Sequence, residues 1–264
     1  MDITEKKKSS DLDDNIKDIM DILKFKYDKL KIIGSSSLKS LKYFSDYDFK
    51  CDIKYNYSDK EIYDEIKGIL RNIFDNPNLY FVEMKIQNKE HKYKWFIGDT
   101  INYDDFIKKI KNMDYIKIDL LAYINFEFVP ISVNYHFKDD KNKEDIIKKL
   151  NNDIKELIKE KRYFKILKRI YSISKINNDN NNVLYLTKIF NSDIGYKYKL
   201  LNVIGTLFDV IKYYKKEPQI KKKIEIVLSN YKLPQTDKLL KKEYEKLNSE
   251  VNMFGKNIYD KIKY

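Results

Sequence analysis

The chain has 264 residues, of which 42% are hydrophobic and 36% are charged, and its formal net charge at pH 7 is +12. No apolar run approaches the ~20 residues that span a bilayer, so we expect no membrane segment. The sequence holds one cysteine, Cys51, and two histidines, His91 and His136. This excludes an intrachain disulfide and a metal site made of cysteine or histidine. Any metal should therefore be a hard cation bound by carboxylates.

The first half of the chain mixes strand and helix patterns. The spacing of its apolar residues, with turn residues between the segments, predicts the elements in chain order. We expect a helix over 13–25, a strand over 29–33, a short helix over 36–44, a strand over 47–55, a helix over 58–74, strands over 79–86 and 93–97, a helix over 103–111, and strands over 115–124 and 127–135. Ser58 is expected to cap the helix that follows it.

The second half shows almost only helical spacing. This spacing predicts helices over 145–173, 183–190, 198–215, 220–230 and 238–259, with the asparagine-rich tract 177–182 as a loop. We therefore expect an α+β fold, with a mixed sheet flanked by helices in a first domain over 1–140. An all-helical domain is expected to follow it over 141–264.

Charge is divided unevenly between these halves. Residues 1–140 hold 24 basic and 26 acidic side chains, whereas residues 141–264 hold 29 basic and 15 acidic ones, a net charge of +14. An AT-rich genome inflates lysine, but codon bias alone would not separate the charges in this way. The excess in the second half is typical of a surface that binds a polyanion such as a nucleic acid.

A glycine–serine run and a pair of aspartates make up the first candidate site. A strand is expected to end at Gly34, where the missing Cβ lets the backbone approach a ligand. Ser35 and Ser36 follow, with hydroxyl and N–H groups that suit phosphate oxygens. Asp46 and Asp48 are two residues apart on the next strand, so both carboxylates point to one face. Such carboxylates repel each other unless a cation lies between them, which predicts a divalent metal.

A third carboxylate lies in the strongly apolar strand predicted over 115–124. Asp119 has Ile118 and Leu120 as its neighbours. A charge in such surroundings is costly to bury unless it is paired or bound to a metal. We therefore expect Asp119 to join the aspartate pair of the earlier strand around the metal.

Together these elements resemble the DNA polymerase beta-type nucleotidyltransferase superfamily. The matching motifs are an apolar residue before Gly-Ser, then Asp-apolar-Asp-apolar, then apolar-Asp-apolar, here Ile33-Gly34-Ser35, Asp46-Tyr47-Asp48-Phe49 and Ile118-Asp119-Leu120. The resemblance covers 25–137, and a helical domain after the catalytic core is also usual in that superfamily. The segments 159–173 and 189–195 are similar to poly(A) polymerase-like proteins of large DNA viruses.

The resemblance implies a role for each matching residue. Asp46, Asp48 and Asp119 would be the catalytic residues and the ligands of Mg²⁺ or Mn²⁺. Asp119 would also help to deprotonate an attacking 3′-hydroxyl, and Ser35 with its neighbours in the Gly-Ser run would contact the triphosphate. The reaction would be an in-line attack on the α-phosphorus with pyrophosphate as the leaving group.

Two further charged segments allow more than one interpretation. Glu83 and Lys85 resemble half of a restriction-type nuclease site. We favour outward-facing charges on an amphipathic strand over a nuclease, and a place in the transferase cleft stays open. The segment 155–175 is rich in lysine and arginine with aromatic residues between them. It either binds a triphosphate or a primer strand, with Lys165 and Lys168 as nucleotide contacts, or is the solvated face of an amphipathic helix.

The resemblance predicts a template-independent enzyme that adds nucleotides, with ATP as the expected donor, to an RNA 3′ end. A small nucleotidyltransferase that modifies a tRNA, a protein or a small molecule is the alternative enzyme. A catalytically inactive RNA-binding scaffold is the alternative outside enzymes. The chain is short for an enzyme that adds nucleotides to an RNA 3′ end, so a partner subunit or a homodimer could supply further RNA contacts. The charged segment 1–14 lacks the apolar core of a secretion signal, which favours the cytoplasm, and the AT-rich composition suggests a virus-encoded protein.

Overall fold

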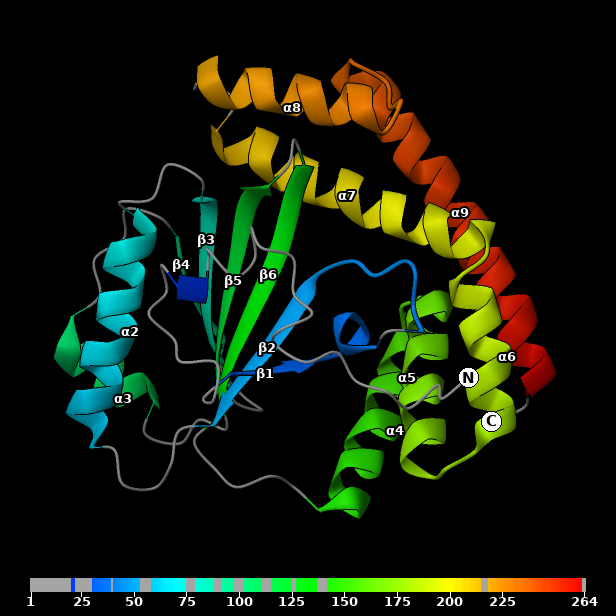
Figure 1. Ribbon diagram of the computed structural model, residues 1–264, viewed down its shortest axis with the longest axis horizontal. Helices are drawn as coiled ribbons and strands as arrows, with labels where there is room; N and C mark the ends of the chain where they lie inside the picture. The colour runs from blue at the N-terminus through cyan, green and yellow to red at the C-terminus, as the bar shows by residue number, and fades with distance from the viewer. Residues whose placement is uncertain are drawn as a thin grey trace. The chain divides into compact units, whose positions relative to one another are not determined.

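The computed structural model describes residues 20–21, 30–38, 40–52, 58–74, 79–87, 92–96, 102–110, 115–124, 127–136, 142–214 and 218–262. The chain divides into two compact units, coloured in chain order in Figure 1. The sheet unit lies within Lys6–Leu38 and Asp46–Asp139, and the helical unit lies within Lys39–Ser45 and Asp140–Tyr264. The predicted fold class, a mixed sheet with flanking helices and a helical part after it, is confirmed.

Within the described residues, one mixed sheet runs through the sheet unit. Its strands are β1 (Leu30–Ile33), β2 (Tyr47–Asp52), β3 (Leu79–Gln87), β4 (Lys92–Phe96), β5 (Tyr115–Ile124) and β6 (Glu127–His136). Their order across the sheet is β1-β2-β6-β5-β3-β4. The strands β2 and β6 run parallel, and the other neighbouring pairs are antiparallel. Each strand predicted from the alternation of apolar residues is present in this sheet.

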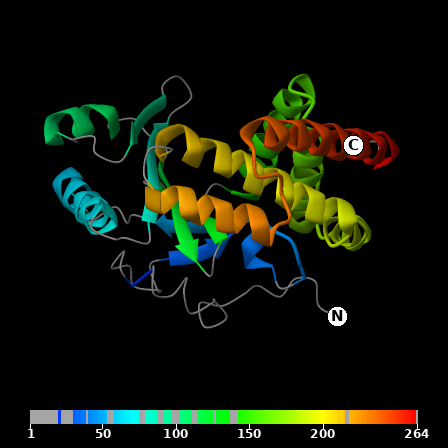
Figure 2. The same cartoon turned by 90° about the horizontal axis from the view of Figure 1, so that it is seen from above.

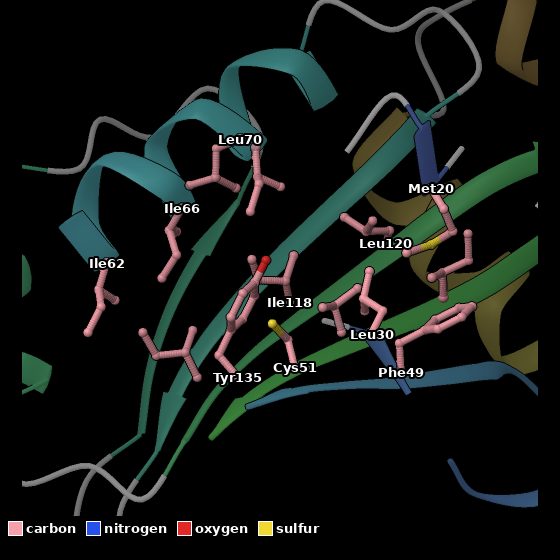
Figure 3. Packing of buried hydrophobic residues seen from close by; sticks show 14 of the residues in the cluster. Met20, Leu30, Phe49, Cys51, Ile62, Ile66, Leu70, Ile118, Leu120 and Tyr135 are labelled. Carbon is pink, nitrogen blue, oxygen red and sulfur yellow. The ribbon is translucent and has the colours of Figure 1, made fainter. Parts of the chain in front are cut away.

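Two helices, α2 (Asp59–Phe74) and α3 (Tyr103–Ile110), pack on one face of this sheet. Alternation along each strand sends every second side chain into the core beneath them. Figure 3 shows this packing, with residues of α2 over residues of the strands, among them Ile62, Ile66, Phe49, Ile118 and Tyr135. Cys51 is 3% exposed in this core, which leaves it no part in a site on the opposite face of the sheet.

The start of α2 is fixed by a reciprocal cap. The backbone N–H of Ser58 donates to Glu61 Oε2 at 2.7 Å, and the backbone N–H of Glu61 donates to Ser58 Oγ at 3.3 Å. Each residue thereby satisfies a donor that the first helical turn leaves without a backbone partner. The hydrogen bonds from Ser58 also hold the pKa of Glu61 below its ordinary value. The predicted cap at Ser58 is confirmed.

The helical unit consists of α4 (Lys143–Lys159), α5 (Tyr163–Ile176), α6 (Asn180–Phe190), α7 (Asp193–Tyr214), α8 (Pro218–Asn230) and α9 (Asp237–Ile262). The helix α5 packs against α4, α6 and α9, and α7 packs against α8 and α9. Figure 2 shows α7 and α8 side by side. Leu167, Ile170, Leu207 and Val210 are fully buried in this unit. None of the described helices is long and apolar enough to cross a bilayer.

The prediction of one helix over 145–173 is wrong. The helix ends at Lys159 and a new one begins at Tyr163, with Lys161 in the left-handed region at φ 57°. The apolar spacing continues across this break because α4 and α5 both bury a face, and α5 packs back against α4. The predicted loop over 177–182 is also too long. Asp179 accepts a hydrogen bond from the backbone N–H of Asn182 and caps α6, which starts at Asn180.

The prediction of a helix over 36–44 is wrong as well. Only the 3₁₀ turn η2 (Ser35–Ser37) forms there, and residues 40–46 follow as irregular chain. The segment Lys39–Ser45 belongs by its contacts to the helical unit, which the predicted division into 1–140 and 141–264 does not anticipate. Of the predicted helix over 13–25, only Met20 and Asp21 are described, both helical.

Candidate functional site

The end of β1 turns sharply and brings Gly34 against Asp48. Gly34 has φ +65°, in the left-handed region that favours glycine. The antiparallel pairing of β1 and β2 sets Ile33 opposite Asp48. A Cβ built at Gly34 would collide with Asp48 Oδ2 and lie 3.1 Å from the carboxyl carbon. Glycine is therefore required here both by the backbone and by the carboxylate beside it.

The serines of η2 do two different things. Ser36 Oγ accepts a hydrogen bond from the backbone N–H of Asp48 at 3.2 Å and donates to the carbonyl of Ile33 at 3.2 Å. Ser37 Oγ donates to the carbonyl of Gly34 at 2.7 Å. These two hydroxyls hold the turn against β2. Ser35 Oγ is buried and has no hydrogen-bond partner among the described residues, so it is the hydroxyl that a ligand could satisfy.

The carboxylates of the two strands lie in one row across the sheet. Asp48 of β2 pairs with Ser132 of β6, and Ser132 pairs with Asp119 of β5. Residues opposite each other in a sheet share a face, and Phe49, which follows Asp48, is in the core on the other face. The late aspartate therefore occupies the same face as the early one. Two strand spacings, about 9.6 Å, separate their Cα atoms.

Asp119 has a basic neighbour along its own strand. Lys117 Nζ lies 3.0 Å from Asp119 Oδ1, and the two side chains are 33% and 24% exposed. This ion pair balances the charge that the apolar surroundings of Asp119 make costly. Among the residues that the structure describes, no three acidic, histidine or cysteine side chains gather closely enough to hold a metal ion by themselves.

The donors at the Gly34 turn nevertheless suit a hard cation. Asp48 belongs to β2 and its carboxylate lies against Gly34, and Asp46 stands directly before that strand. Mg²⁺ is commonly held by one or two carboxylates and completes its shell with waters and substrate phosphates. The aspartate pair therefore fits such an ion, whereas Asp119 is separated from it by Ser132 and is paired with Lys117.

Ser132 is a residue of this face that the sequence interpretation missed. It is 2% exposed, and its hydroxyl has no hydrogen-bond partner in the described part of the chain. It lies in register between Asp48 and Asp119. A small polar residue between Ile131 and Val133 gives the same signal that singled out Asp119, but a serine carries no charge and attracts less notice. Its place could be recognised only once the register of β6 was known.

Asn191 is a second missed residue, and it lies in the helical unit. Its Oδ1 accepts a hydrogen bond from the backbone N–H of Lys42 at 2.7 Å, and its Nδ2 donates to the carbonyl of Ser40 at 2.6 Å. The ring of Tyr43 packs against that of Tyr196 at 5.4 Å. These contacts fix the segment that joins the Gly-Ser turn to Asp46, which explains why this segment is not a helix.

The basic segment 155–175 is divided between α4 and α5. Lys168 Nζ lies 5.5 Å from the centre of the Tyr198 ring, and Lys165 is half-buried. Phe164 and Tyr171 are 2% and 5% exposed and pack against other rings of the helical unit. Both aromatic residues therefore belong to the core of the helical unit, as the alternative of an amphipathic helix predicts. A nucleotide contact at Lys165 or Lys168 stays a prediction.

The fold of this chain is similar to those of two solved structures, one of which is described as a nucleotidyl transferase. The chain is similar to the M. chilensis Mg662 protein complexed with GTP, with 16% identity, a TM-score of 0.66, and coverage of 89% of this chain and 87% of that one. It is also similar to a Megaviridae nucleotidyl transferase, with 16% identity, a TM-score of 0.65, and coverage of 90% and 86%. At such identities the likeness establishes the fold alone.

Sequence comparisons add little to this likeness. No family model matches the chain. Over 257 residues it is 25% identical to the CRISPR-associated endoribonuclease Cas13a of Leptotrichia shahii, and the match covers 79% of this chain but 18% of that protein. So small a share of that protein gives no reason to transfer its activity to this chain.

Proposed function

We propose that this chain is a metal-dependent nucleotidyltransferase that adds nucleotides to an RNA 3′ end, with ATP as the preferred donor. The contact between Gly34 and the Asp48 carboxylate supports this most directly, because it joins a turn suited to phosphate with a carboxylate suited to a metal. The Mg662 protein, which has the same fold, is complexed with GTP. That complex supports a nucleoside triphosphate as the substrate of this chain.

Asp46 and Asp48 would hold Mg²⁺ or Mn²⁺. When bound, the ion offsets the negative charge of the triphosphate and of the pyrophosphate that leaves. The Ser35 hydroxyl, which is buried without a partner in the described chain, would donate a hydrogen bond to a phosphate oxygen. Asp119 would accept the proton of the 3′-hydroxyl. The hydroxyl oxygen then bonds to the α-phosphorus, and the bond from the α-phosphorus to the oxygen bridging to the β-phosphate breaks, so that pyrophosphate leaves. Lys165 and Lys168 would contact the triphosphate.

Primer extension tests the proposal. A labelled RNA oligonucleotide is incubated with ATP, CTP, GTP or UTP in turn, with Mg²⁺ or Mn²⁺, and its length is followed on a gel. We expect growth of the RNA that is strongest with ATP and lost when EDTA removes the metal. Transfer of label to a tRNA, a protein or a small molecule would identify that molecule as the acceptor in place of the RNA 3′ end. Absence of transfer to every acceptor would contradict an enzymatic function.

A further inference from the structure

Ser132 combines deep burial with a hydroxyl that the described chain leaves without a hydrogen bond. It is 2% exposed, and its Oγ has no partner among the described residues. A buried hydroxyl without a hydrogen bond is costly, and most such groups in proteins are paired. Two residues further along β6, Asn134 shows the usual outcome, because its Nδ2 donates to the carbonyl of Phe49 at 3.3 Å. Ser132 therefore carries a cost that an alanine of nearly the same size would avoid.

The sheet register gives this hydroxyl two acidic neighbours. Ile131 and Val133 belong to the core, so the side chain of Ser132, which lies between them in the strand, points to the opposite face. On that face, Asp48 of β2 lies on one side of Ser132 and Asp119 of β5 lies on the other. One strand spacing of about 4.8 Å separates Ser132 from each of them. Ser132 is thus the middle residue of a row of three.

The three side chains of this row differ in what they can bind. Ionised carboxylates only accept hydrogen bonds, whereas the hydroxyl of Ser132 also donates one. Asp48 is half-buried and the side chain of Asp119 is 24% exposed, so the row is reached from solvent on both sides of Ser132. A ligand group that lies here meets a donor between two acceptors. An alcohol hydroxyl matches this arrangement, because it donates one hydrogen bond and accepts others.

The proposed transfer reaction places such a hydroxyl at the same point. The metal and the triphosphate would lie at Asp48, and Asp119 would take the proton of the attacking 3′-hydroxyl. The attacking oxygen must then lie between these two residues, and Ser132 is the residue that the register sets between them. This step of the inference rests on the proposed function, whereas the burial of Ser132 and its position in the row do not.

We propose that Ser132 binds the 3′-hydroxyl of the acceptor and positions its oxygen for attack. The O–H of Ser132 donates a hydrogen bond to that oxygen, and the proton of the 3′-hydroxyl goes to Asp119. One lone pair of the oxygen accepts from Ser132, and another forms the bond to the α-phosphorus. Ser132 keeps its own proton throughout, and the acceptor supplies the hydrogen-bond partner that the described chain does not provide.

The stability of the protein without ligands gives the first test. Ser132→Ala removes a buried hydroxyl that has no partner to lose, so the thermal midpoint should stay equal or rise by up to about 2–4 °C. Ser174→Ala is the matched control, because Ser174 of α5 is also 2% exposed and its Oγ also has no partner in the described chain. Both variants should shift the midpoint in the same direction. A fall in Ser132→Ala alone would show a hydrogen bond within the folded chain and would overturn the proposal.

Two RNA oligonucleotides that differ by one oxygen atom test the contact itself. One ends in a ribose with a 3′-hydroxyl and the other ends in 3′-deoxyribose, and both carry a fluorophore at the 5′ end. Fluorescence anisotropy measures how tightly the full chain binds each, with Mg²⁺ and an ATP analogue whose α–β bridging oxygen is a methylene group. We expect the unmodified protein and Ser174→Ala to bind the 3′-hydroxyl end more tightly, by up to about tenfold, the contribution of one hydrogen bond. Ser132→Ala should bind both ends equally.

Ser132→Thr separates the hydroxyl from the packing around it, because it keeps the hydroxyl and should keep the preference. An equal preference in Ser132→Ala and the unmodified protein would overturn the proposal, as would the absence of any preference in the unmodified protein. Loss of the preference in both Ser132 variants would trace it to packing and would overturn the proposal too. A preference that depends on the Ser132 hydroxyl, without incorporation of nucleotides, would contradict the proposed function alone. Incorporation with a preference unaffected by Ser132→Ala would contradict the role of Ser132 alone.

Discussion

The two units of this protein arrange their charges in different ways. In the helical unit, cations stand beside acids on the same or a neighbouring helix, as in the pairs Lys159–Glu156, Arg169–Asp153, Lys197–Glu250 and Lys256–Asp260. In the sheet unit, the described ion pairs join neighbours on one element, Lys109–Asp105 on α3 and Lys117–Asp119 on β5. Exposed pairs contribute little to stability, whereas the Lys117–Asp119 pair is partly buried on the sheet face that also carries Asp48.

This difference shows that net charge alone does not locate a candidate site. The excess of +14 over residues 141–264 points to the helical unit, whereas residues 1–140 have a net charge of −2. Yet the near-neutral part carries Asp48 and Asp119 on one face of its sheet, and the basic part pairs many of its charges. The expected effects below test this comparison, beginning with the largest.

Asp48→Ala should reduce nucleotide transfer by about a hundredfold or more, because it removes an oxygen ligand whose charge holds the metal. The thermal midpoint should stay equal or rise, since Asp48 no longer faces another carboxylate two residues away. Transfer of α-labelled nucleotide and thermal unfolding measure the two effects. Asp64→Ala, on the exposed side of α2, is the control and should change neither. Retained transfer in Asp48→Ala would remove this residue from the site.

Gly34→Ala should lower the free energy of unfolding by at least about 1–2 kcal/mol, the cost of a left-handed backbone for a residue with a Cβ. The collision with Asp48 Oδ2 should also displace the carboxylate and lower transfer. Gly68→Ala is the control, because a Cβ there meets nothing within 4 Å in the middle of α2. It should stabilise the chain by about 0.5–1 kcal/mol. Urea unfolding measures both, and equal shifts would contradict the strained turn.

Asn191→Ala should lower the free energy of unfolding by about 1–3 kcal/mol, because two hydrogen bonds to the segment Lys39–Ser45 are lost. It should also reduce turnover more than it raises KM, since this segment leads directly into Asp46. Asn191→Asp keeps the acceptor for the Lys42 N–H and loses the donor to Ser40, so its effects should be intermediate. Normal turnover in a destabilised Asn191→Ala protein would limit Asn191 to a structural role.

The smallest effect is expected from the helical unit. Lys165→Gln with Lys168→Gln should raise the KM for the nucleotide and leave turnover nearly unchanged, if these lysines only contact the triphosphate. The salt dependence of oligonucleotide binding should stay that of the unmodified protein. Steady-state kinetics and anisotropy measure the two quantities. A flattened salt dependence in this variant would place the nucleic acid on α5.

The sequence predicts the elements of this fold well where one strand or helix buries one face. The bounds of β5 follow directly from the alternation around Asp119, and α2 follows from the Ser58 cap and its apolar side. The sequence cannot reveal the break at Lys161, because apolar spacing runs through both helices. It also cannot reveal the irregular chain after Ser37, because that conformation depends on Asn191, which is far away in the sequence.

The residues of the candidate site also differ in whether the sequence alone reveals them. Gly34 and Asp48 can be recognised from local motifs, since their contact arises from one hairpin-like pairing of β1 and β2. The row from Asp48 through Ser132 to Asp119 depends instead on the parallel pairing of β2 with β6, whose register no local pattern fixes. For that reason the place of Ser132 is recognised only in the structure.

Release of pyrophosphate tests the proposed chemistry most directly. The purified protein is given each nucleoside triphosphate with Mg²⁺ and an RNA oligonucleotide, and both pyrophosphate and incorporated α-labelled nucleotide are measured. We expect one pyrophosphate for each nucleotide incorporated, and neither product from the Asp48→Ala protein. Release of inorganic phosphate in place of pyrophosphate, or equal release by Asp48→Ala, would contradict nucleotidyl transfer at the Gly34–Asp48 turn.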